Sequence, residues 1–380
     1  MKMVEITENK APTPARVLLV SHRNLYDPEV WRAGIREFEE TVQEMDSVDL
    51  LVPRRKKWFK ERKSNALRVG KYSSLILNPG VERTQLSKYY DLLFVVCEKP
   101  SELLNVNVIE GWKDYCKTSI CWLTEFLEKD MPIYKSALKV LAKFDHVLFI
   151  TVWTEAFKPL LEGRMSYLPA GIDAIRFCPY PNPPERFIDV LSIGRRSEQT
   201  HRALLRMARN NEIFYVYDTI KDLGAYNVEE HRLLFANMAK RSRYFIVNPG
   251  KIDLPGETGG KSEFGQRYFE GLAPGAILIG ERPKDNKEFD RIFNWPDAVI
   301  HVPFGSENIG AIIRELDKDP ERQTAIRRKN ITQSLLCHDW AYRWEFVLKL
   351  AGLEAMPNLL ERKQHLADIA MRFAKEPMGG

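Results

Sequence analysis

The stretch GKSEFGQRYFEGLAPGAILIG, residues 260–280, predicts a glycine-rich loop, a helix and a buried strand in immediate succession. The glycines allow a ligand to approach the backbone closely, and Ser262 can cap a helix that begins there. On such a helix Glu263 and Glu270 share one face, because about two turns separate them. The strand, AILIG, is apolar throughout, which is typical of a parallel strand covered on both faces. The stretch therefore predicts a ligand-binding loop in an α/β fold.

Short apolar runs of strand length recur on both sides of this stretch. They alternate with segments long enough for helices, a pattern typical of a parallel sheet with helices on both faces. A proline-rich span, residues 169–184, interrupts the pattern and indicates a linker. The runs before it are RVLLVS (16–21), VDLLVP (48–53), SLILNP (74–79), DLLFVVCE (91–98), SICWLTEF (119–126) and HVLFITV (146–152), and those after it are DVLSIG (189–194), IFYVYD (213–218), RYFIVNP (243–249), AILIG (276–280) and AVIHVP (298–303).

The two series of runs predict two Rossmann-like, doubly wound domains. A chain of 380 residues has room for them, because a domain holds about 150 residues. The expected parts are a flexible leader (1–14), an N-terminal domain (15–170), a linker (171–186), a C-terminal domain (187–345) and C-terminal helices that brace the first domain (346–380).

The composition is that of a folded soluble protein, with 44% hydrophobic and 29% charged residues. The five cysteines are scattered, odd in number and free of a C-x-x-C pair, which indicates a reducing compartment and disfavours a structural zinc site. Neither a secretory signal nor an apolar run of about 20 residues is present in the sequence. We therefore expect a cytoplasmic protein, whose membrane contact could only be peripheral, at the inner membrane face.

The segment RRKKWFKERK, residues 54–63, carries seven basic residues and one acid, with two aromatic residues between them. One interpretation is a solvated, charged loop. The other is a surface that attracts an anionic polymer, lipid headgroups or DNA, on which the aromatic rings stack on bases or enter a membrane interface. The residues that we single out for an anionic partner are Arg54, Arg55, Lys56, Lys57 and Trp58.

Ligands of doubly wound sheets bind beyond the carboxyl ends of the strands. The strand DVLSIG ends at Gly194 and is followed by Arg195 and Arg196, and a helix is expected to begin just beyond them. Guanidinium groups beside a helix N-terminus suit a diphosphate, although either arginine could also be a solvated surface residue. In the stretch 260–280, Glu270 could accept the hydroxyls of a ribose. Glu263 could equally be a first-turn acid that the helix dipole stabilises.

The run EFGQRYFEGLAPGAILIG resembles the donor-site helix of group 1 glycosyltransferases with the GT-B fold, whose pattern E-G-F-G-x-x-x-x-E-A-x-A-x-G-x-P-V-V has two glutamates separated by seven residues. YLPAGIDAIRFCPYP is similar to their interdomain signature, DVLSIGRR to their phosphate-contacting strand exit, and HDWAYRWEFVLKL to their closing helix. A narrower likeness is to the CgeB-type spore-maturation branch. The positions that match the group 1 pattern are Phe264, Gly265, Glu270, Ala273 and Gly275, and those that match the CgeB-type version, G-x-R-x-F/Y-E-x-x-A, are Gly265, Arg267, Phe269, Glu270 and Ala273.

The resemblance implies two domains that face each other across a cleft, with a C-terminal helix crossing back to the first domain. It implies a UDP- or GDP-sugar as co-substrate, no required cofactor, no metal, and transfer with retention of configuration. The acceptor could be a glycan, a small molecule, a protein or modified DNA. The donor site implied comprises Gly194, Arg195, Arg196, Ser262, Phe264, Gly265, Arg267 and Glu270, with Glu263 near the reacting sugar as a catalytic residue.

In that architecture the first domain binds the acceptor. Glu125 is the best candidate for an acceptor-side acid or base, with an ordinary surface glutamate as the alternative. His22 could contact the donor or a reacting hydroxyl, but a histidine at a strand end is as often structural. All the candidates at the strand exits of this domain are His22, Arg23, Glu98, Lys99, Thr124 and Glu125.

The sequence departs from the family pattern at three places. The first glutamate of the pattern falls on Ser262, so that Glu263 is displaced by one position. The usual lysine after the Gly-Arg pair is absent, and SHRNLYDPEV stands where an N-terminal glycine-rich turn is expected. These departures motivate a second hypothesis: a catalytically weakened protein of the same fold that acts as a nucleotide-sugar or nucleic-acid binding or scaffold module.

Overall fold

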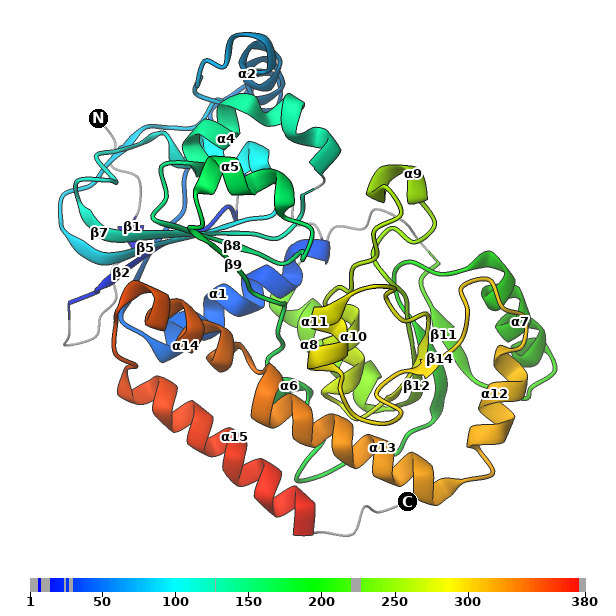
Figure 1. The fold of residues 1–380 in the computed structure, drawn as a ribbon. Coiled ribbons are helices and arrows are strands. Elements are labelled where there is room, and N and C mark those ends of the chain that lie inside the picture. Colours follow the sequence, from blue (N-terminus) through cyan, green and yellow to red (C-terminus); the bar gives the residue numbers. More distant parts are fainter. Residues whose placement is uncertain are drawn as a thin grey trace. The chain divides into compact units, whose positions relative to one another are not determined.

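A computed structural model describes residues 6–7, 14–23, 25–26, 30–126, 128–219 and 227–375. By its internal contacts the chain divides into unit 1, residues 1–169 and 343–360, and unit 2, residues 170–342 and 361–380 (Figure 1). Most of the expected leader lies outside the described residues. Within the described part, no helix combines the length and the apolar character that a bilayer span requires.

Unit 1 is built on a sheet of seven strands whose central strands are buried on both faces. All neighbouring strands are parallel except the first, which pairs antiparallel at the edge. The expected strand at 74–79 does not form, and Leu75 and Leu77 within it are exposed. The spatial order is β1 (Ile6–Thr7), β3 (Val48–Leu51), β2 (Val17–Val20), β5 (Tyr90–Cys97), β7 (Cys116–Leu123), β8 (His146–Phe149) and β9 (Met165–Tyr167); β4 (Thr84–Gln85) and β6 (Ile109–Glu110) pair separately.

Helices cover both faces of this sheet, with α1 and α14 on one side and α4 and α5 on the other (Figure 1). The Trp344 ring of α14 packs edge-on against Phe94 at 5.5 Å between centroids, and its Nε1 donates to the Asp46 carboxylate at 2.9 Å. The chain thus returns to its first unit, as predicted. The helices are α1 (Ala33–Met45), α2 (Phe59–Ser73), α3 (Leu103–Val106), α4 (Lys135–Leu141), α5 (Lys158–Leu161) and α14 (Trp340–Ala351), with short 3₁₀ helices η1 (Val30–Arg32), η2 (Pro100–Glu102), η3 (Glu128–Tyr134) and η4 (Glu155–Phe157).

Unit 2 has a sheet of five parallel strands in the order β11, β10, β12, β13, β14. Helices α7 and α12 lie on one face and α8 and α10 on the other (Figure 1). The prediction of two Rossmann-like, doubly wound domains is confirmed. The strands are β10 (Ile188–Ser192), β11 (Tyr215–Tyr217), β12 (Ser242–Val247), β13 (Ile277–Gly280) and β14 (Ile300–His301). The helices are α6 (Ala174–Phe177), α7 (Glu198–Arg209), α8 (Val228–Lys240), α9 (Pro255–Thr258), α10 (Arg267–Leu272), α11 (Lys287–Ile292), α12 (Ile309–Leu316), α13 (Pro320–Gln333), the π-helical η5 (Ser334–His338) and α15 (Pro357–Lys375).

The glycine that ends β13 allows two strands to approach closely. A Cβ atom on Gly280 would lie 1.7 Å from the carbonyl oxygen of Val247 in β12. We expect Gly280→Ala to lower the free energy of unfolding by about 3 kcal/mol, because the strands must separate to admit the methyl group. Gly256→Ala in α9 is the control, since nothing lies within 4 Å of its added Cβ. Equal effects in urea denaturation would contradict this explanation.

Candidate functional site

Each sheet has a point at which the chain reverses its direction of winding, between β2 and β5 in unit 1 and between β10 and β12 in unit 2. At such a point the connections leave to opposite sides and open a crevice beyond the carboxyl ends of the strands, where ligands of this class of fold bind. Residues 21–23 and 98–102 lie at this point in unit 1, and residues 193–197 and 248–250 lie at it in unit 2.

In unit 2, the loop after β10 holds its arginines with acids and carbonyls of neighbouring loops. Gly194 has a φ of +92°, and its N–H donates to the Asp218 carboxylate. The Arg196 guanidinium donates to the Asp218 carbonyl at 2.8 Å and lies 5.2 Å from the Tyr217 ring centroid. Arg195 forms an ion pair with Asp253, and both side chains are roughly a third or more exposed. The loop therefore presents two arginines that a ligand can reach.

The helix after this loop, α7, begins at Glu198, just beyond the two arginines. Ser197 caps α7, its hydroxyl accepting from the N–H of Thr200 at 3.4 Å. A narrow pocket lies beside this cap, on the face of the sheet that α7 covers, and Arg196 is the one donor-site candidate among its lining residues. The lining residues that bear polar side chains are Ser192, Arg196, Ser197, Thr200, His201, Tyr215 and Asn248.

On the other face of the sheet, Glu270 is held between two arginines. Its carboxylate pairs with Arg267 at 2.6 Å and with Arg232 of α8, and its side chain is only 4% exposed. Burial alone would raise the pKa of the Glu270 carboxyl, but the two guanidinium groups outweigh burial and hold this pKa below its ordinary value. The Arg267 side chain borders Gly194, because a Cβ there would lie 3.5 Å from its Nε. Glu270 thus directs a third arginine to the loop after β10.

The expectation of a helix from Ser262 is wrong, because α10 begins at Arg267. Glu263 instead forms an antiparallel bridge with Gly250, whose N–H donates to its carbonyl at 2.7 Å. Asn286 donates to the Ser262 carbonyl at 3.0 Å and to the Glu263 carboxylate at 3.2 Å. Glu263 and Glu270 therefore do not share a helix face.

The remaining residues of the predicted donor motif lie in different surroundings. The Phe264 ring is buried among aromatic neighbours that include Tyr268 and Phe289, so that only its backbone could contact a donor. Gly265 has open space where a Cβ would be added. The roles that the resemblance implies for these residues stay predictions.

In unit 1, His22 follows β2 and is buried at the point of reversal. Its Nε2 lies 3.5 Å from the Sγ atom of Cys97 and 3.9 Å from a carboxylate oxygen of Glu102, and its side chain is 3% exposed. Its Nδ1 has no hydrogen-bond partner among the described residues. The histidine thus has one nitrogen beside its neighbours and the other buried with no partner in the described part of the chain.

One arginine serves two carboxylates beside this histidine. Arg32 lies 2.6 Å from Glu102 and 2.8 Å from Glu98. For Glu102, burial would raise the pKa, but His22 and Arg32 outweigh burial and lower it. For Glu98, burial is not outweighed: despite Arg32, burial together with the nearby acids Glu102 and Glu125 raises the pKa to about 9. At neutral pH Glu98 is therefore a protonated acid beside an ionised one.

We expect this arrangement to give Glu98→Gln a pH-dependent effect on stability. The pKa of Glu98 rises on folding, from an ordinary value near 4.5 to about 9. The native state therefore loses stability as the pH increases across this range, because the unfolded chain releases the proton more readily. The neutral amide removes this loss. The variant should therefore gain stability over the parent between pH 5 and pH 9, by at least about 1 kcal/mol. A difference in unfolding free energy that stays constant with pH would contradict a protonated Glu98.

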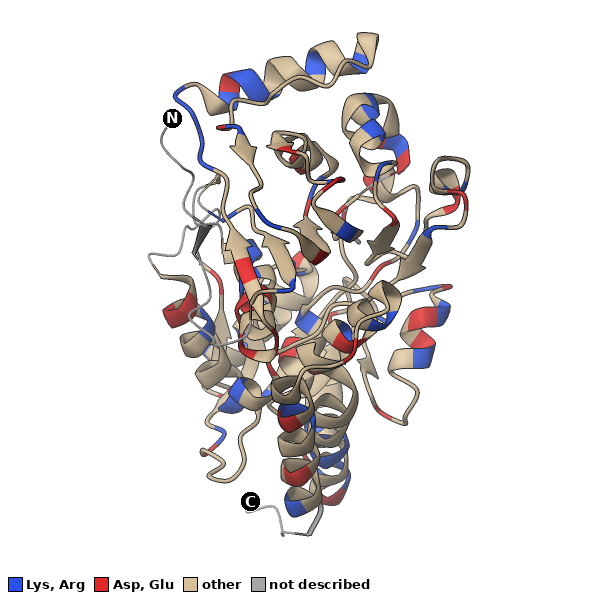
Figure 2. Cartoon of the chain, turned by 90° about the vertical axis from the view of Figure 1, so that its left-hand side faces the viewer, with Lys and Arg blue, Asp and Glu red and all other residues tan. Residues whose placement is uncertain are grey.

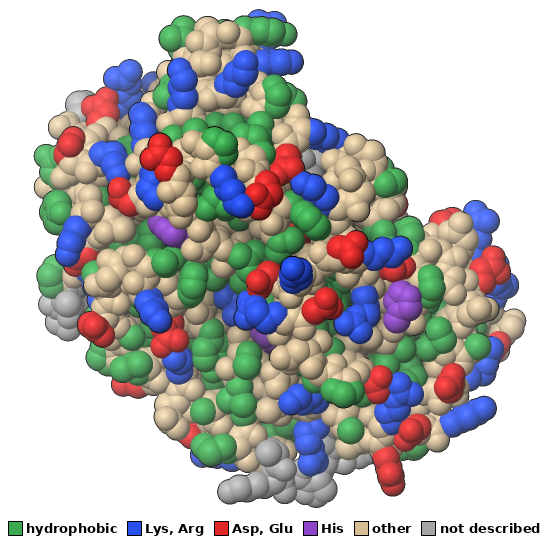
Figure 3. All heavy atoms as spheres, viewed as in Figure 1, with side chains coloured by type: hydrophobic (Ala, Val, Ile, Leu, Met, Phe, Trp, Pro, Cys, Tyr) green, Lys and Arg blue, Asp and Glu red, His purple; other side chains and the backbone are tan. Residues whose placement is uncertain are grey.

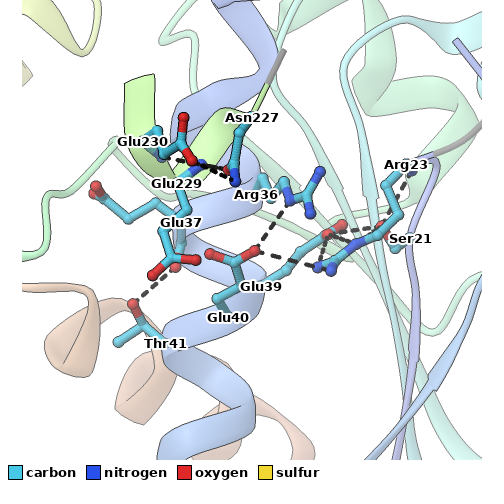
Figure 4. Close-up of polar contacts among 10 residues, drawn as sticks. All are labelled: Ser21, Arg23, Arg36, Glu37, Glu39, Glu40, Thr41, Asn227, Glu229 and Glu230. Carbon is cyan, nitrogen blue, oxygen red and sulfur yellow. Dashed lines mark hydrogen bonds and ion pairs between the residues drawn. The ribbon is translucent and has the colours of Figure 1, made fainter. Parts of the chain in front are cut away.

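The other candidates of unit 1 occupy the same edge of the sheet. Arg23 turns back to the Glu39 carboxylate at 2.8 Å, which also accepts from the Ser21 hydroxyl at 2.6 Å (Figure 4). Glu125 is half-buried, and its N–H donates to the Glu98 carbonyl at 2.7 Å. The remaining members of this edge are Lys99, which is exposed, and Thr124, which is half-buried.

An open pocket of about 330 Å³ lies in unit 1 beside α2, lined in part by Tyr26, Phe59 and Lys63. The Tyr26 ring stacks under the Arg32 guanidinium at 4.2 Å, and its hydroxyl accepts from Lys63 at 2.9 Å. The pocket is thereby linked through Tyr26 and Arg32 to the buried His22 cluster.

His22, Cys97 and Glu102 are also a group of potential metal ligands within the described residues, their donor atoms lying within 4.8 Å of one another. Arg32 already neutralises Glu102, and burial raises the pKa of the Cys97 thiol well above its ordinary value. A metal site requires the thiolate and a free carboxylate. We therefore interpret the group as hydrogen-bonded and attribute no metal to it.

Several residues of these clusters cannot be singled out from the sequence. Arg232 lies in the middle of a helix and Arg32 precedes one, positions at which arginine is common and carries no signal. Glu102, in contrast, could have been proposed from the sequence, because it follows the same strand as Glu98, within the same strand-exit segment. Asp218 had the same kind of signal, since it follows β11 directly.

Comparison with known proteins adds a family match to this geometry. Residues 221–349 match the family model described as glycosyl transferase-like. No match is found among curated proteins. The match covers the segment that contains α8, α10 and the Arg232–Glu270–Arg267 cluster. The spore-maturation branch stays a prediction, because the match does not distinguish it.

Solved structures show remote likenesses over nearly the whole chain. A glycosyltransferase from Rickettsia africae ESF-5 has 11% identity and a TM-score of 0.41, with 96% of this chain and 99% of that chain covered. An alpha-glucosyltransferase in complex with UDP-glucose and DNA has 9% identity and a TM-score of 0.48, with 89% and 99% covered. The lipopolysaccharide outer core galactosyltransferase WaaB has 12% identity and a TM-score of 0.40, with 88% and 99% covered. These likenesses are too remote to bear on the chemistry of this chain.

Proposed function

We propose that the protein is a glycosyltransferase that moves a sugar from a nucleoside diphosphate sugar to an acceptor hydroxyl. The observation that carries this proposal is the convergence of Arg195, Arg196 and Arg267 on the loop after β10, at the point of reversal of unit 2. The match of residues 221–349 to a glycosyl transferase-like model supports it. A UDP- or GDP-sugar is the proposed co-substrate.

The donor diphosphate is proposed to lie beside Gly194, within reach of Arg195, Arg196 and Arg267. Arg196 and Arg267 donate to its oxygens, and Arg195 exchanges its exposed partner Asp253 for a phosphate oxygen. The Ser197-capped N-terminus of α7 adds positive potential at the same place. Glu270 can still accept a ribose hydroxyl, because a carboxylate has about four acceptor positions and its arginines use two.

The reaction breaks the bond between the anomeric carbon and the diphosphate oxygen and forms a bond from that carbon to the acceptor oxygen. The leaving diphosphate takes the electron pair and gains negative charge, which the fixed guanidinium groups stabilise without reorganisation. The acceptor hydroxyl gives its proton to the leaving diphosphate in the same process. His22, Glu125 and Glu263 stay the proposed catalytic residues, and retention of configuration and independence of metal are proposed on the family resemblance alone.

Titration calorimetry with UDP-glucose, UDP-N-acetylglucosamine, GDP-mannose and their free diphosphates tests the proposal. We expect ligands with either uracil or guanine to bind, but not both. The free nucleoside diphosphate should bind at least as tightly as the nucleotide sugar, because the arginines contact the phosphates. Without an acceptor, slow hydrolysis of the nucleotide sugar would show that the protein activates the bond between the sugar and the diphosphate. Chromatography measures the diphosphate that is released. Failure of every nucleotide to bind would overturn the proposal, whereas binding without release or transfer would favour the scaffold hypothesis.

A further inference from the structure

A strongly basic surface surrounds α2 in unit 1. Residues 54–71 contain nine lysines and arginines and one acid, Glu61. Figure 2 shows basic positions along this helix and along the segment that leads into it, and Figure 3 shows basic side chains gathered over the same end of unit 1. We call the exposed side chains of residues 54–77 the α2 surface. The site proposed above uses none of them.

The inner side of α2 is fixed to unit 1. Phe59 packs in a small buried cluster with Leu25, Val81 and Val108. Gly70 faces α4 so closely that a Cβ atom would lie 2.1 Å from the Ser136 hydroxyl oxygen. This packing fixes the orientation of α2, so that its opposite side faces the solvent.

The outer side of α2 carries large apolar side chains among its charges. Trp58 is 60% exposed, Val69 is 37% exposed and Tyr72 is 80% exposed. Val69 and Tyr72 are three residues apart and share one face of the helix, whereas Trp58 precedes the helix at its N-cap; we call these three residues the stripe. Leu75 and Leu77, which follow the helix, are 56% and 40% exposed. Five exposed apolar residues within 20 positions exceed what a solvated helix needs.

Basic and aromatic groups are paired at both ends of this stripe. The Lys57 ammonium lies 5.3 Å from the Trp58 ring centroid, and the Lys71 ammonium lies 5.5 Å from that of Tyr72. Tryptophan and tyrosine with adjacent lysines are the side chains that favour the boundary between headgroups and acyl chains. Both ends of the helix thus have the same chemical character.

We propose that the α2 surface docks the protein on an anionic lipid membrane. The basic residues face the headgroups, and the stripe from Trp58 to Tyr72, continued by Leu75 and Leu77, enters the interfacial layer. Exposed leucine and valine favour lipid over nucleic acid, because neither gains from contact with phosphates or base edges. The proposal stands independently of the glycosyltransferase proposal, since it uses no residue of that site.

Flotation of the full chain with vesicles tests the docking. We expect binding to phosphatidylcholine vesicles that contain about a third phosphatidylglycerol and no binding to pure phosphatidylcholine. The variant Arg55→Ser/Lys56→Ser/Lys57→Ser should weaken this binding roughly 100-fold. The matched control removes three exposed charges of α7, with Arg202, Arg206 and Arg209 replaced by serine, and should leave the binding unchanged.

A second pair of variants separates lipid from nucleic acid. Trp58→Ser/Tyr72→Ser keeps every charge and should weaken vesicle binding about 10-fold, whereas Leu233→Ser/Leu234→Ser, which changes two exposed apolar residues of α8, should not. Brominated lipids should quench part of the tryptophan fluorescence, and Trp58→Phe should abolish that part. Equal vesicle binding by Trp58→Ser/Tyr72→Ser and the parent, or tighter binding to a 20-base-pair duplex than to the vesicles, would overturn the proposal. Circular dichroism verifies that each variant is folded.

Discussion

Replacement of Arg267 by alanine is expected to weaken the binding of the nucleoside diphosphate by about 100-fold. The Arg267 guanidinium borders Gly194, where the diphosphate is proposed to lie, and a charge-assisted hydrogen bond in a partly buried site contributes about 1.5–3 kcal/mol. Calorimetry should show that the affinity for the diphosphate falls while that for the nucleoside alone is unchanged, because only the phosphates contact this side chain.

Two further variants make this test specific. Arg267→Lys keeps the charge but loses the forked geometry, so it should recover part of the affinity. Arg202→Ala in α7 removes an arginine that is 68% exposed and paired with Glu198, and it should change nothing. If Arg267→Ala bound the diphosphate as tightly as the parent, the donor would have to lie elsewhere and the proposed site would be wrong.

Replacement of Glu270 by glutamine is expected to lower the free energy of unfolding by about 3–5 kcal/mol. The carboxylate neutralises Arg232, whose side chain is 3% exposed, and breaking one partner of a buried pair leaves the other charge without compensation. Urea denaturation at pH 7 measures this loss. The exposed pair of Glu198 with Arg202 provides the comparison, and Glu198→Gln should cost less than about 0.5 kcal/mol.

The stability lost in Glu270→Gln should depend on pH, because the Glu270 carboxylate titrates. The pKa of Glu270 is lower in the folded protein than its ordinary value of 4.5, so its ionised form stabilises the fold above that pH. This contribution disappears as the pH falls from about 4.5 through the lower folded-state pKa. The parent and Glu270→Gln should therefore converge in stability in acid. A stability gap that persisted unchanged at pH 3 would show that the glutamine acts through packing and not through lost charge.

The sheets could be predicted from the sequence because a parallel strand that is buried on both faces appears as a short, continuous run of apolar residues. Runs such as DVLSIG and DLLFVVCE are largely apolar, and each forms a central strand, β10 and β5. The doubly wound arrangement then follows from the alternation of these runs with helices. The run at 74–79 misled the prediction because its leucines are exposed, which apolarity alone cannot reveal.

The site could be predicted only as far as its strand exits. Arg196 and His22 lie where the pattern placed them, but their partners depend on which strands are neighbours. Glu270 pairs with Arg232, which is 38 residues distant, and no local pattern distinguishes that arginine from others. The helix start at Ser262 failed for a similar reason: the long-range bridge between Glu263 and Gly250 extends the backbone and overrides the local tendency of a serine to cap.

The division of the chain means that unit 1 is completed late during synthesis. Its sheet is formed by residues before 170, yet Trp344, which covers Phe94 and bonds to Asp46, follows the whole of the intervening unit. At ribosomal rates of about 5–20 residues per second, synthesis of the intervening residues 170–342 leaves that apolar face uncovered for roughly 9–35 s. The nascent first domain is therefore a natural client for chaperones, and a truncated chain that stops at residue 169 should be aggregation-prone unless the 343–360 segment is supplied in trans.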